Sequence, residues 1–166
     1  MFHSSIIRLA EVVNHTLIAR KQMIVTAESC TGGLIAAALT DVPGSSAAVF
    51  GGYITYANEA KSGMIGVDRD LIRAHGAVSE QVARAMAEGA LKTSGAAVAI
   101  AVTGIAGPGG GTEGKPVGLV HFAYADADKT LHLEKRFGDR GRQVVREETV
   151  NTALGMVLDG LGVPRP

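Results

Sequence analysis

The residues in this sequence that are best suited to chemistry are three consecutive candidate nucleophiles, Ser29, Cys30 and Thr31. They follow the apolar, β-favouring segment 23–25 and precede the alanine-rich segment 34–39, which favours a short buried strand, a turn and a helix. The backbone N–H groups at such a helix start are unpaired, so they could hold an anion or a developing oxyanion. From this stretch alone, however, a simple helix N-cap is the more economical explanation of Ser and Thr.

A serine nucleophile needs a base, and the sequence points to a lysine. No H-x-x-x-H, H-E-x-x-H or G-x-S-x-G motif is present, which argues against a catalytic metal and against an α/β-hydrolase. A serine can use a lysine that is desolvated enough to be neutral. Lys61 is the best-placed lysine, because it follows the β-rich segment 47–56, although a lone lysine on a short helix is usually solvated. Cys30 is the competing nucleophile, but a lone cysteine is more often a packing residue.

The segments that must position these residues alternate between helical and strand-like patterns. Apolar periodicity predicts helices over 4–20, 34–39, 58–65, 68–75, 78–95 and 141–160, with Asn58 as a helix cap. Strand patterns cover 23–25, 47–56, 96–102, 119–125 and 130–137, the last two as an antiparallel hairpin. Because 96–102 is continuously apolar, we expect a central strand buried on both faces. We therefore predict one α/β domain over 1–166, with helices on both faces of a mixed sheet.

A glycine-rich loop, 103–112, follows the predicted central strand. So much backbone freedom is costly unless the chain must approach something closely. Because loops after parallel strands meet at one edge of a sheet, we expect this loop and the Ser29 turn to form one crevice for an anionic ligand, such as a nucleotide phosphate. Neither loop matches a P-loop or a dinucleotide fingerprint, so ATP hydrolysis and a dinucleotide cofactor lack support.

Composition narrows the class of protein further. With 166 residues, 46% hydrophobic and 19% charged, the chain should form an ordered domain. Sixteen basic residues balance sixteen acidic ones, which argues against a nucleic-acid partner held by a strong overall positive field. One cysteine excludes an intramolecular disulfide and a multi-cysteine zinc site. Without a secretory signal or an apolar run long enough to span a bilayer, we expect a cytoplasmic protein with no membrane partner.

Seven motifs, taken together and in order, resemble the C-terminal domain family of the competence-damage protein CinA. They occupy 27–33, 43–46, 52–61, 65–67, 75–80, 103–108 and 115–118. Stand-alone members of this family are nicotinamide mononucleotide amidohydrolases. The resemblance implies a three-layer α/β/α sandwich and hydrolysis of the carboxamide to nicotinate mononucleotide and ammonia, in pyridine-nucleotide salvage. It also implies a Ser/Lys mechanism without metal or cofactor, and a homo-oligomer such as a dimer. An N-terminal domain resembling molybdopterin-binding proteins, fused in some members, is expected to be absent.

The resemblance assigns candidate roles to individual residues. Ser29 would be the nucleophile and Lys61 its base, although Ser46 lies in an equally matched motif and could be catalytic or phosphate-binding. Tyr56 and Thr103 would be proton-relay or orienting hydroxyls, or else plain structural hydrogen-bond donors. Amides near the glycines would supply an oxyanion hole or phosphate cradle. The other substrate-binding candidates are Thr31, Gly32, Gly33, Asn58, Gly104, Gly107 and Arg142.

An arginine motif near the C-terminus departs from the family pattern. The family usually shows G-D-R-x-x-V-R, but here only Arg142 and Arg146 keep the R-x-x-V-R spacing, which leaves the role of Arg140 open. An arginine there could pair with the substrate phosphate or face solvent. The alternative to an enzyme is a non-catalytic nucleotide-binding module acting through a partner protein. The presence of both Ser29 and Lys61 favours the enzyme, because a module that only binds needs neither.

Overall fold

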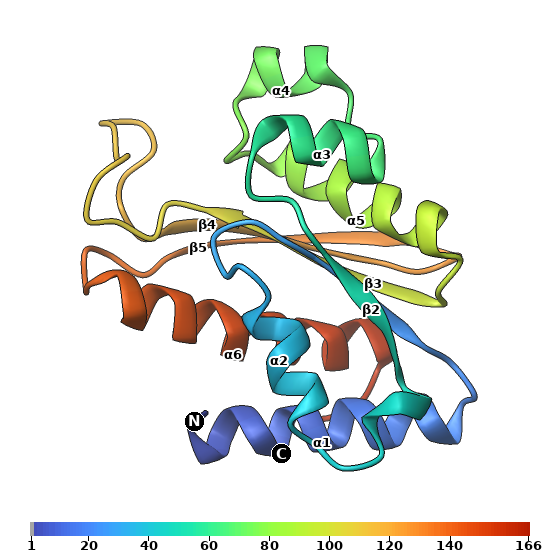
Figure 1. Ribbon diagram of the computed structural model, residues 1–166. Helices are drawn as coiled ribbons and strands as arrows, with labels where there is room; N and C mark the ends of the chain where they lie inside the picture. The colour runs from blue at the N-terminus through green and yellow to red at the C-terminus, as the bar shows by residue number, and fades with distance from the viewer. Residues whose placement is uncertain (1) are drawn as a thin grey trace.

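The computed structural model describes residues 2–166, which form a five-stranded sheet between two layers of helices (Figure 1). The strands are β1 (Ile24–Glu28), β2 (Val49–Ile54), β3 (Val98–Gly104), β4 (Leu119–Ala125) and β5 (Thr130–Arg136). The helices are α1 (Ser4–Ala19), α2 (Leu34–Thr40), α3 (Asn58–Ile65), α4 (Arg69–His75), α5 (Glu80–Ser94) and α6 (Arg142–Leu161), with a 3₁₀ turn at Ser45–Ala47.

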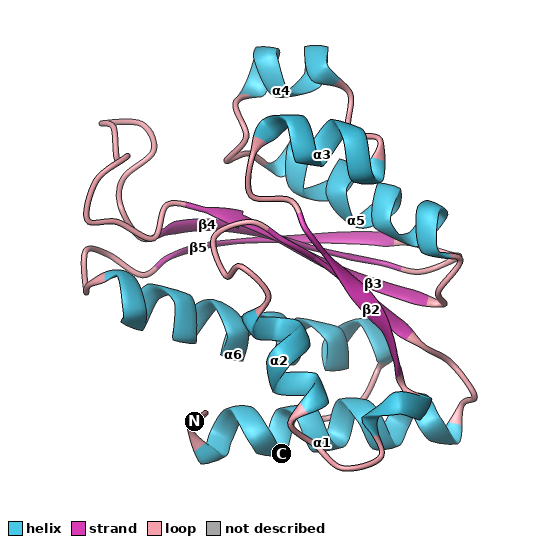
Figure 2. Ribbon diagram, viewed as in Figure 1, coloured by secondary structure: helices cyan, strands magenta, loops and turns pink. Residues whose placement is uncertain are grey.

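The sheet is mixed and has the order β2-β1-β3-β4-β5. Strands β2, β1 and β3 run parallel, whereas β4 is antiparallel to β3 and β5 is antiparallel to β4. Helices α3, α4 and α5 lie on one side of the sheet, and α1, α2 and α6 lie on the other (Figures 1 and 2). The predicted three-layer α/β/α sandwich with a mixed central sheet is therefore confirmed.

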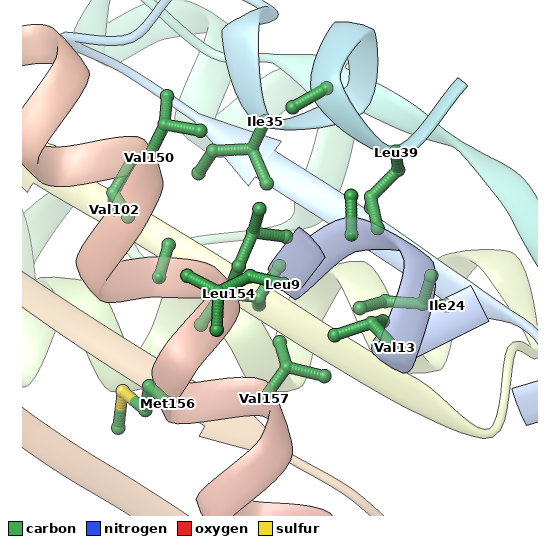
Figure 3. Packing of buried hydrophobic residues seen from close by; sticks show 14 of the residues in the cluster. Leu9, Val13, Ile24, Ile35, Leu39, Val102, Val150, Leu154, Met156 and Val157 are labelled. Atoms are coloured by element: carbon green, nitrogen blue, oxygen red, sulfur yellow. The ribbon is translucent and has the colours of Figure 1, made fainter. Parts of the chain in front are cut away.

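The larger core lies between the sheet and helices α1, α2 and α6. Leu154 of α6, Ile35 of α2 and Val102 of β3 are all fully buried there (Figure 3). Each such side chain contributes about 1.5–3 kcal/mol when it leaves water. Since β3 is buried on both faces, as its continuous apolar pattern predicted, the carboxyl end of β3 has a rigid base.

On the other face, the sheet presents small side chains to α5. These residues are Ala27, Ala99, Ala101, Ala123 and Ala125. Helix α3 lies equally close to α5, because a Cβ at Gly89 of α5 would clash with the Ile65 carbonyl oxygen at the end of α3. Only glycine permits this contact, which holds α3 against α5 and so fixes the helix that carries Lys61.

Three local predictions need correction. The prediction that Asn58 caps a helix was wrong: Asn58 is the first residue of α3, and Ala57 holds the extended N-cap position with no side-chain cap. The central strand is displaced by two residues toward the C-terminus, to Val98–Gly104. Strand β2 starts at Val49, because the 3₁₀ turn occupies 45–47. No helix within residues 2–166 is long and apolar enough to cross a membrane.

Candidate active site

The candidate site lies where the parallel strands end. The Thr55 amide donates to the Glu28 carbonyl and the Ser29 amide donates to the Val102 carbonyl, which continues the ladder one residue beyond β1 and β2. At this position of the ladder, polar residues of all five strands or their extensions lie side by side across the sheet. They form a row that consists of Thr55, Ser29, Thr103, His121 and Glu134. Side chains of one row share a face, and the preceding odd-numbered residues of β1 and β3 pack against α5. Ser29 therefore faces the layer that contains α3.

Lys61 reaches this row from α3. Its Nζ atom lies 3.1 Å from Ser29 Oγ and donates to the Thr55 carbonyl at 2.8 Å and to the Tyr56 carbonyl at 3.3 Å. Two carbonyl acceptors hold the amine, so the lysine cannot swing away without losing both hydrogen bonds. The structure thus brings together the nucleophile and the base that the sequence proposed. Thr55, which the sequence interpretation did not single out, supplies the shorter of the two carbonyl contacts.

The charge environment of Lys61 suits a base. Only 1% of its surface is exposed, and no carboxylate forms an ion pair with it among the described residues. Burial therefore lowers the pKa of Lys61 from its usual value, because the charged form loses hydration and no acid compensates. A lowered pKa increases the fraction of neutral amine, the form that can accept a proton from Ser29.

A buried carboxylate, Glu28, holds the turn that carries Ser29. Its Oε2 atom accepts hydrogen bonds from the Thr31 hydroxyl at 2.7 Å and the Gly33 amide at 3.0 Å. The Ile35 and Ala36 amides of α2 also donate to Glu28, at 3.0 and 2.9 Å. Glu28 thus caps α2 and satisfies its own charge at the positive end of the helix. The position had a signal in the sequence, since an acid before the turn is a known helix-start preference, but its role went unnoticed.

Arg146 holds the same turn from α6. Its Nε atom donates to the Cys30 carbonyl at 3.1 Å and Nη2 donates to the Thr31 carbonyl at 3.0 Å. The turn is therefore tied on one side to a carboxylate that binds its amides and on the other to a guanidinium that binds its carbonyls. Such a double clamp positions Ser29 without involving the Ser29 side chain.

The backbone amides near Ser29 that lack a partner are not those of the glycines, which the sequence interpretation had expected. The Gly32 amide donates to the Ser29 carbonyl and the Gly33 amide to Glu28, so neither is available to an anion. In contrast, the amides of Cys30 and Thr31 donate to no other residue in the part of the chain that is described. Two adjacent backbone donors with no partner in another residue, next to a serine hydroxyl, are an arrangement that can stabilise an oxyanion.

The glycine loop after β3 packs against the chain that leads into β4. A Cβ at Gly104 would lie 2.7 Å from Val120 Cγ2, and one at Gly107 would lie 2.7 Å from Val117 Cγ1. These two glycines therefore allow the loop to lie close to the chain that enters β4. Thr103 is buried and its hydroxyl donates to the Ala77 carbonyl at 2.8 Å, which is the structural role that the sequence interpretation had left open.

Arg142 connects the glycine loop with Tyr56, whose carbonyl accepts from Lys61. It donates through Nη1 to the Gly107 carbonyl and through Nη2 to the Tyr56 hydroxyl, both at 3.0 Å. This joins the ends of β2 and β3, the two strands that flank β1. Both Arg142 and Tyr56 are exposed, and Arg142 forms no ion pair within residues 2–166. The guanidinium charge is therefore uncompensated and accessible to an anionic ligand.

Three of the remaining candidates do not join this group. Ser46 is exposed in the 3₁₀ turn that precedes β2, at the opposite end of the strand from Ser29. Asn58 is exposed and lines a surface pocket of about 290 Å³ between α3 and α4. Arg140 pairs with Glu148 at 3.5 Å on the exposed side of α6. The two arginines that keep the R-x-x-V-R spacing, Arg142 and Arg146, are therefore the ones that lie at the site.

Cys30 has the wrong environment for a nucleophile. Burial raises the pKa of its thiol to about 12, so the thiol is protonated near neutral pH. No cluster of three or more His, Cys, Asp or Glu residues that could hold a metal occurs in the described chain. The arrangement therefore defines a three-layer α/β/α domain with a buried serine–lysine pair at the carboxyl edge of its parallel strands.

Comparison with known proteins places this domain in a family. Residues 6–161 match the family model of the CinA C-terminal domain, and the chain belongs to that family. It is 62% identical over 162 residues to a putative competence-damage inducible protein of Symbiobacterium thermophilum, covering 90% of this chain and 37% of the relative. It is 51% identical over 150 residues to a CinA-like protein of a Synechococcus strain, covering 90% and 36%. The chain thus spans a little over a third of these relatives' length.

Solved structures show the same fold over the whole domain. The competence/damage inducible protein CihA from Agrobacterium tumefaciens superimposes with a TM-score of 0.94 at 51% identity, covering 96% of this chain and 97% of that one. A competence-damaged protein (CinA) superfamily protein from Escherichia coli gives a TM-score of 0.88 at 33% identity, covering 95% and 92%. The resemblance first read from sequence motifs is therefore confirmed at the level of family and fold.

Proposed function

We propose that this chain is an amidohydrolase that converts the carboxamide of nicotinamide mononucleotide to a carboxylate and ammonia. The observation that carries the proposal is the 3.1 Å contact between Lys61 Nζ and Ser29 Oγ, made by a lysine that is buried without a carboxylate. A lysine that only stabilised the fold would be expected to pair with an acid, because an unpaired buried ammonium is costly. A base, in contrast, has to be neutral.

The first half of the reaction forms an acyl-enzyme. Ser29 Oγ attacks the carboxamide carbon, and the hydroxyl proton passes to the neutral Lys61 amine. The amides of Cys30 and Thr31 donate to the oxyanion of the tetrahedral intermediate, and one such donor contributes about 10²–10³-fold to the rate. The intermediate then collapses: the C–N bond breaks, Lys61 returns the proton to the leaving nitrogen, and ammonia departs.

The second half restores the enzyme. A water molecule attacks the ester carbon while Lys61 accepts its proton, and the new intermediate breaks at the bond to Ser29 Oγ. The proton passes from Lys61 to the serine oxygen, and the product leaves as a carboxylic acid, which ionises. One amide and one water thus give one carboxylic acid and one ammonia, with Lys61 neutral before and after.

Arg142 supports a nucleotide rather than a free amide as the substrate. Its guanidinium binds the hydroxyl of Tyr56, the residue next to the Lys61 contacts, and has no acidic partner, whereas Arg140 nearby is paired with Glu148. A phosphate monoester carries the charge and the acceptor geometry that a guanidinium binds through two parallel hydrogen bonds. The substrate would thus be oriented with its phosphate toward Arg142 and its carboxamide toward Ser29.

The test is release of ammonia and nicotinate mononucleotide from nicotinamide mononucleotide, with a chelator present. We expect activity in the wild type, loss of at least about 10²-fold in Ser29→Ala, and near-normal activity in the matched variant Cys30→Ala. Loss of activity in Cys30→Ala with retention in Ser29→Ala would contradict the assignment. Thermal stabilisation by the nucleotide without ammonia release from the wild type would instead support a module that binds without turnover.

A further inference from the structure

Thr55 carries a polar group that the mechanism above does not use. Its side chain is fully buried, and its hydroxyl oxygen Oγ1 has no hydrogen-bond partner among the described residues. An unpaired buried hydroxyl destabilises a folded protein, so most buried hydroxyls are paired. A valine would fill nearly the same space without this cost. Packing alone therefore gives no reason for an oxygen at this position.

Thr55 lies beside Ser29, where β1 and β2 end. Ile54 pairs with Glu28, whose carbonyl also accepts from the Thr55 amide at 2.8 Å. Thr55 is therefore the neighbour of Ser29 across the two strands, and neighbours of this kind point their side chains to the same face. Lys61 reaches this face too, because its Nζ atom lies 3.1 Å from Ser29 Oγ. The unpaired hydroxyl and the amine of the base thus lie on the same side of the sheet.

The Thr55 carbonyl brings the amine close to the hydroxyl. Nζ of Lys61 donates to this carbonyl at 2.8 Å, and the carbonyl carbon and Cβ of Thr55 are bonded to the same Cα atom. The hydroxyl has three staggered positions about the Cα–Cβ bond, and some of them lie beside the carbonyl. Rotation of one side chain, without movement of the backbone, can therefore bring Oγ1 to the amine.

The resting amine of Lys61 needs no further acceptor, but its charged form does. A neutral amine has two N–H groups and one lone pair. The carbonyls of Thr55 and Tyr56 accept from the two N–H groups, and the lone pair faces the Ser29 hydroxyl. When Lys61 takes the proton of Ser29, it becomes an ammonium with three N–H groups and a charge that burial leaves poorly hydrated.

We propose that the Thr55 hydroxyl is the additional acceptor for the Lys61 ammonium that forms during the reaction. The N–H group that donates to the Thr55 carbonyl is then shared with Oγ1, as in other three-centre hydrogen bonds. The third N–H group stays directed at the leaving nitrogen, to which Lys61 returns the proton. Because Thr55 acts through Lys61 without touching the substrate, it is a positioning residue. Its part in the reaction rests on the proposed function.

A contact that forms only with the charged lysine favours the transition state over the bound substrate, so it raises kcat and leaves KM unchanged. Hydrogen bonds to charged groups are the stronger ones, so Thr55→Val should lower kcat about tenfold or more at nearly constant KM. Thr55→Ser keeps the hydroxyl and should restore most of the rate. Where Lys61 is neutral, Thr55→Val should resist urea at least as well as the wild type, because it removes an unpaired hydroxyl.

The same contact should affect the titration of Lys61. At low pH the ammonium of the substrate-free enzyme gains the same acceptor, so loss of the hydroxyl should lower the pKa of Lys61 further. In Thr55→Val the acid limb of kcat/KM should therefore move to lower pH, while the plateau of the rate falls. A purely structural lesion would lower the plateau without moving the limb.

Few other charges act on this amine, and the Thr55 variants change none of them. The Cys30 thiol, on the turn after β1, acts on it directly. Glu28 and Arg146 act on Cys30 in turn. At the end of β2, Tyr56 provides a carbonyl to the amine and a hydroxyl to Arg142. Helices α4 and α5, which pack against α3, provide it with no ion pair within residues 2–166.

The matched control is Thr26→Val. Thr26 on β1 is also a buried threonine whose hydroxyl has no partner, but it packs against Gly52 on the face toward α2. Its replacement should change neither kcat nor the titration of Lys61. That titration can be followed without substrate, from the NMR signal of the Lys61 ε-carbon across pH in the wild type and the variants.

The outcomes separate this role from the proposed function. A lower kcat and a lower Lys61 titration midpoint in Thr55→Val, both restored by Thr55→Ser and both absent from Thr26→Val, establish the role. An unchanged midpoint or an unchanged kcat in Thr55→Val overturns it. Absence of ammonia release from the wild type overturns the proposed function, and the NMR midpoint then still decides whether the Thr55 hydroxyl binds the ammonium.

Discussion

Replacement of Lys61 by methionine offers the sharpest test of the buried base. The change keeps the length and much of the volume of the side chain but removes the amine that contacts Ser29 Oγ at 3.1 Å. General-base catalysis contributes about 10²–10⁴-fold, so ammonia release should fall by that range. Lys61→Arg should not restore activity, because a guanidinium does not deprotonate near neutral pH.

The same variant should reveal the lowered pKa through stability. At low pH, Lys61 is charged in both the folded and the unfolded chain, and the folded wild type carries the full cost of a buried charge. Above the lowered pKa of the folded state, the unfolded chain still binds the proton until about pH 10.4, so wild-type stability rises with pH in this window. Each pKa unit of lowering contributes about 1.4 kcal/mol to this rise.

The measurement is the free energy of unfolding by urea for both proteins, from about pH 7 to about pH 10.4. All other titrating groups are common to the two chains, so the difference between the curves isolates Lys61. We expect the wild type to gain stability relative to Lys61→Met as pH rises. The wild-type rate should instead rise only up to the lowered pKa of folded Lys61 and then level off, because the amine is neutral above that pKa. A difference that stays constant with pH would refute the reasoning, because it would show an unperturbed lysine.

Three further predictions concern the surroundings of the pair. Glu28→Gln should lower the free energy of unfolding by about 1–3 kcal/mol and reduce kcat more than it changes KM, because the turn that carries Ser29 loses its charged cap. Glu59→Gln on α3 is the exposed control, and equal effects of the two variants in denaturation and rate assays would count against this role of Glu28. Because burial raises the pKa of Cys30 to about 12, the folded protein should resist iodoacetamide and Cys30→Ala should remain active; inactivation that tracks labelling would argue otherwise. Arg142→Gln should raise KM for the phosphate-bearing substrate about tenfold or more, whereas Arg140→Gln, which loses only its pairing with Glu148, should not. Similar KM values for the two variants would contradict the assignment of Arg142 to the phosphate.

The sequence determined which segments form helices and which form strands. Period-3.6 and period-2 patterns are local, so every helix and strand was predicted from nearby residues, and the continuous apolar run before Thr103 identified the buried central strand. Boundaries were less certain. The amide geometry that makes Ala57 rather than Asn58 the N-cap depends on how β2 leaves the sheet, which a local pattern does not contain.

The sequence also determined which residue types were available for chemistry. Motif order identified Ser29 and Lys61 as a pair, although they are 32 positions apart. Their contact and the burial of the lysine, however, come from parallel strands that end at one edge and from a helix held close by Gly89. Burial is a property of the packed layers, so the direction of the Lys61 pKa shift could not be read from the chain alone.

Only the tertiary structure determined which contacts the other candidate site residues make. It assigned the Gly33 amide to Glu28, the Thr103 hydroxyl to a backbone carbonyl, and Arg142 to the Gly107 carbonyl and the Tyr56 hydroxyl. It also separated Ser46 from Ser29, because a parallel strand carries its two ends to opposite edges of the sheet. Spacing along a chain tells which residues could act together. Only the register and direction of the strands decide which of them meet.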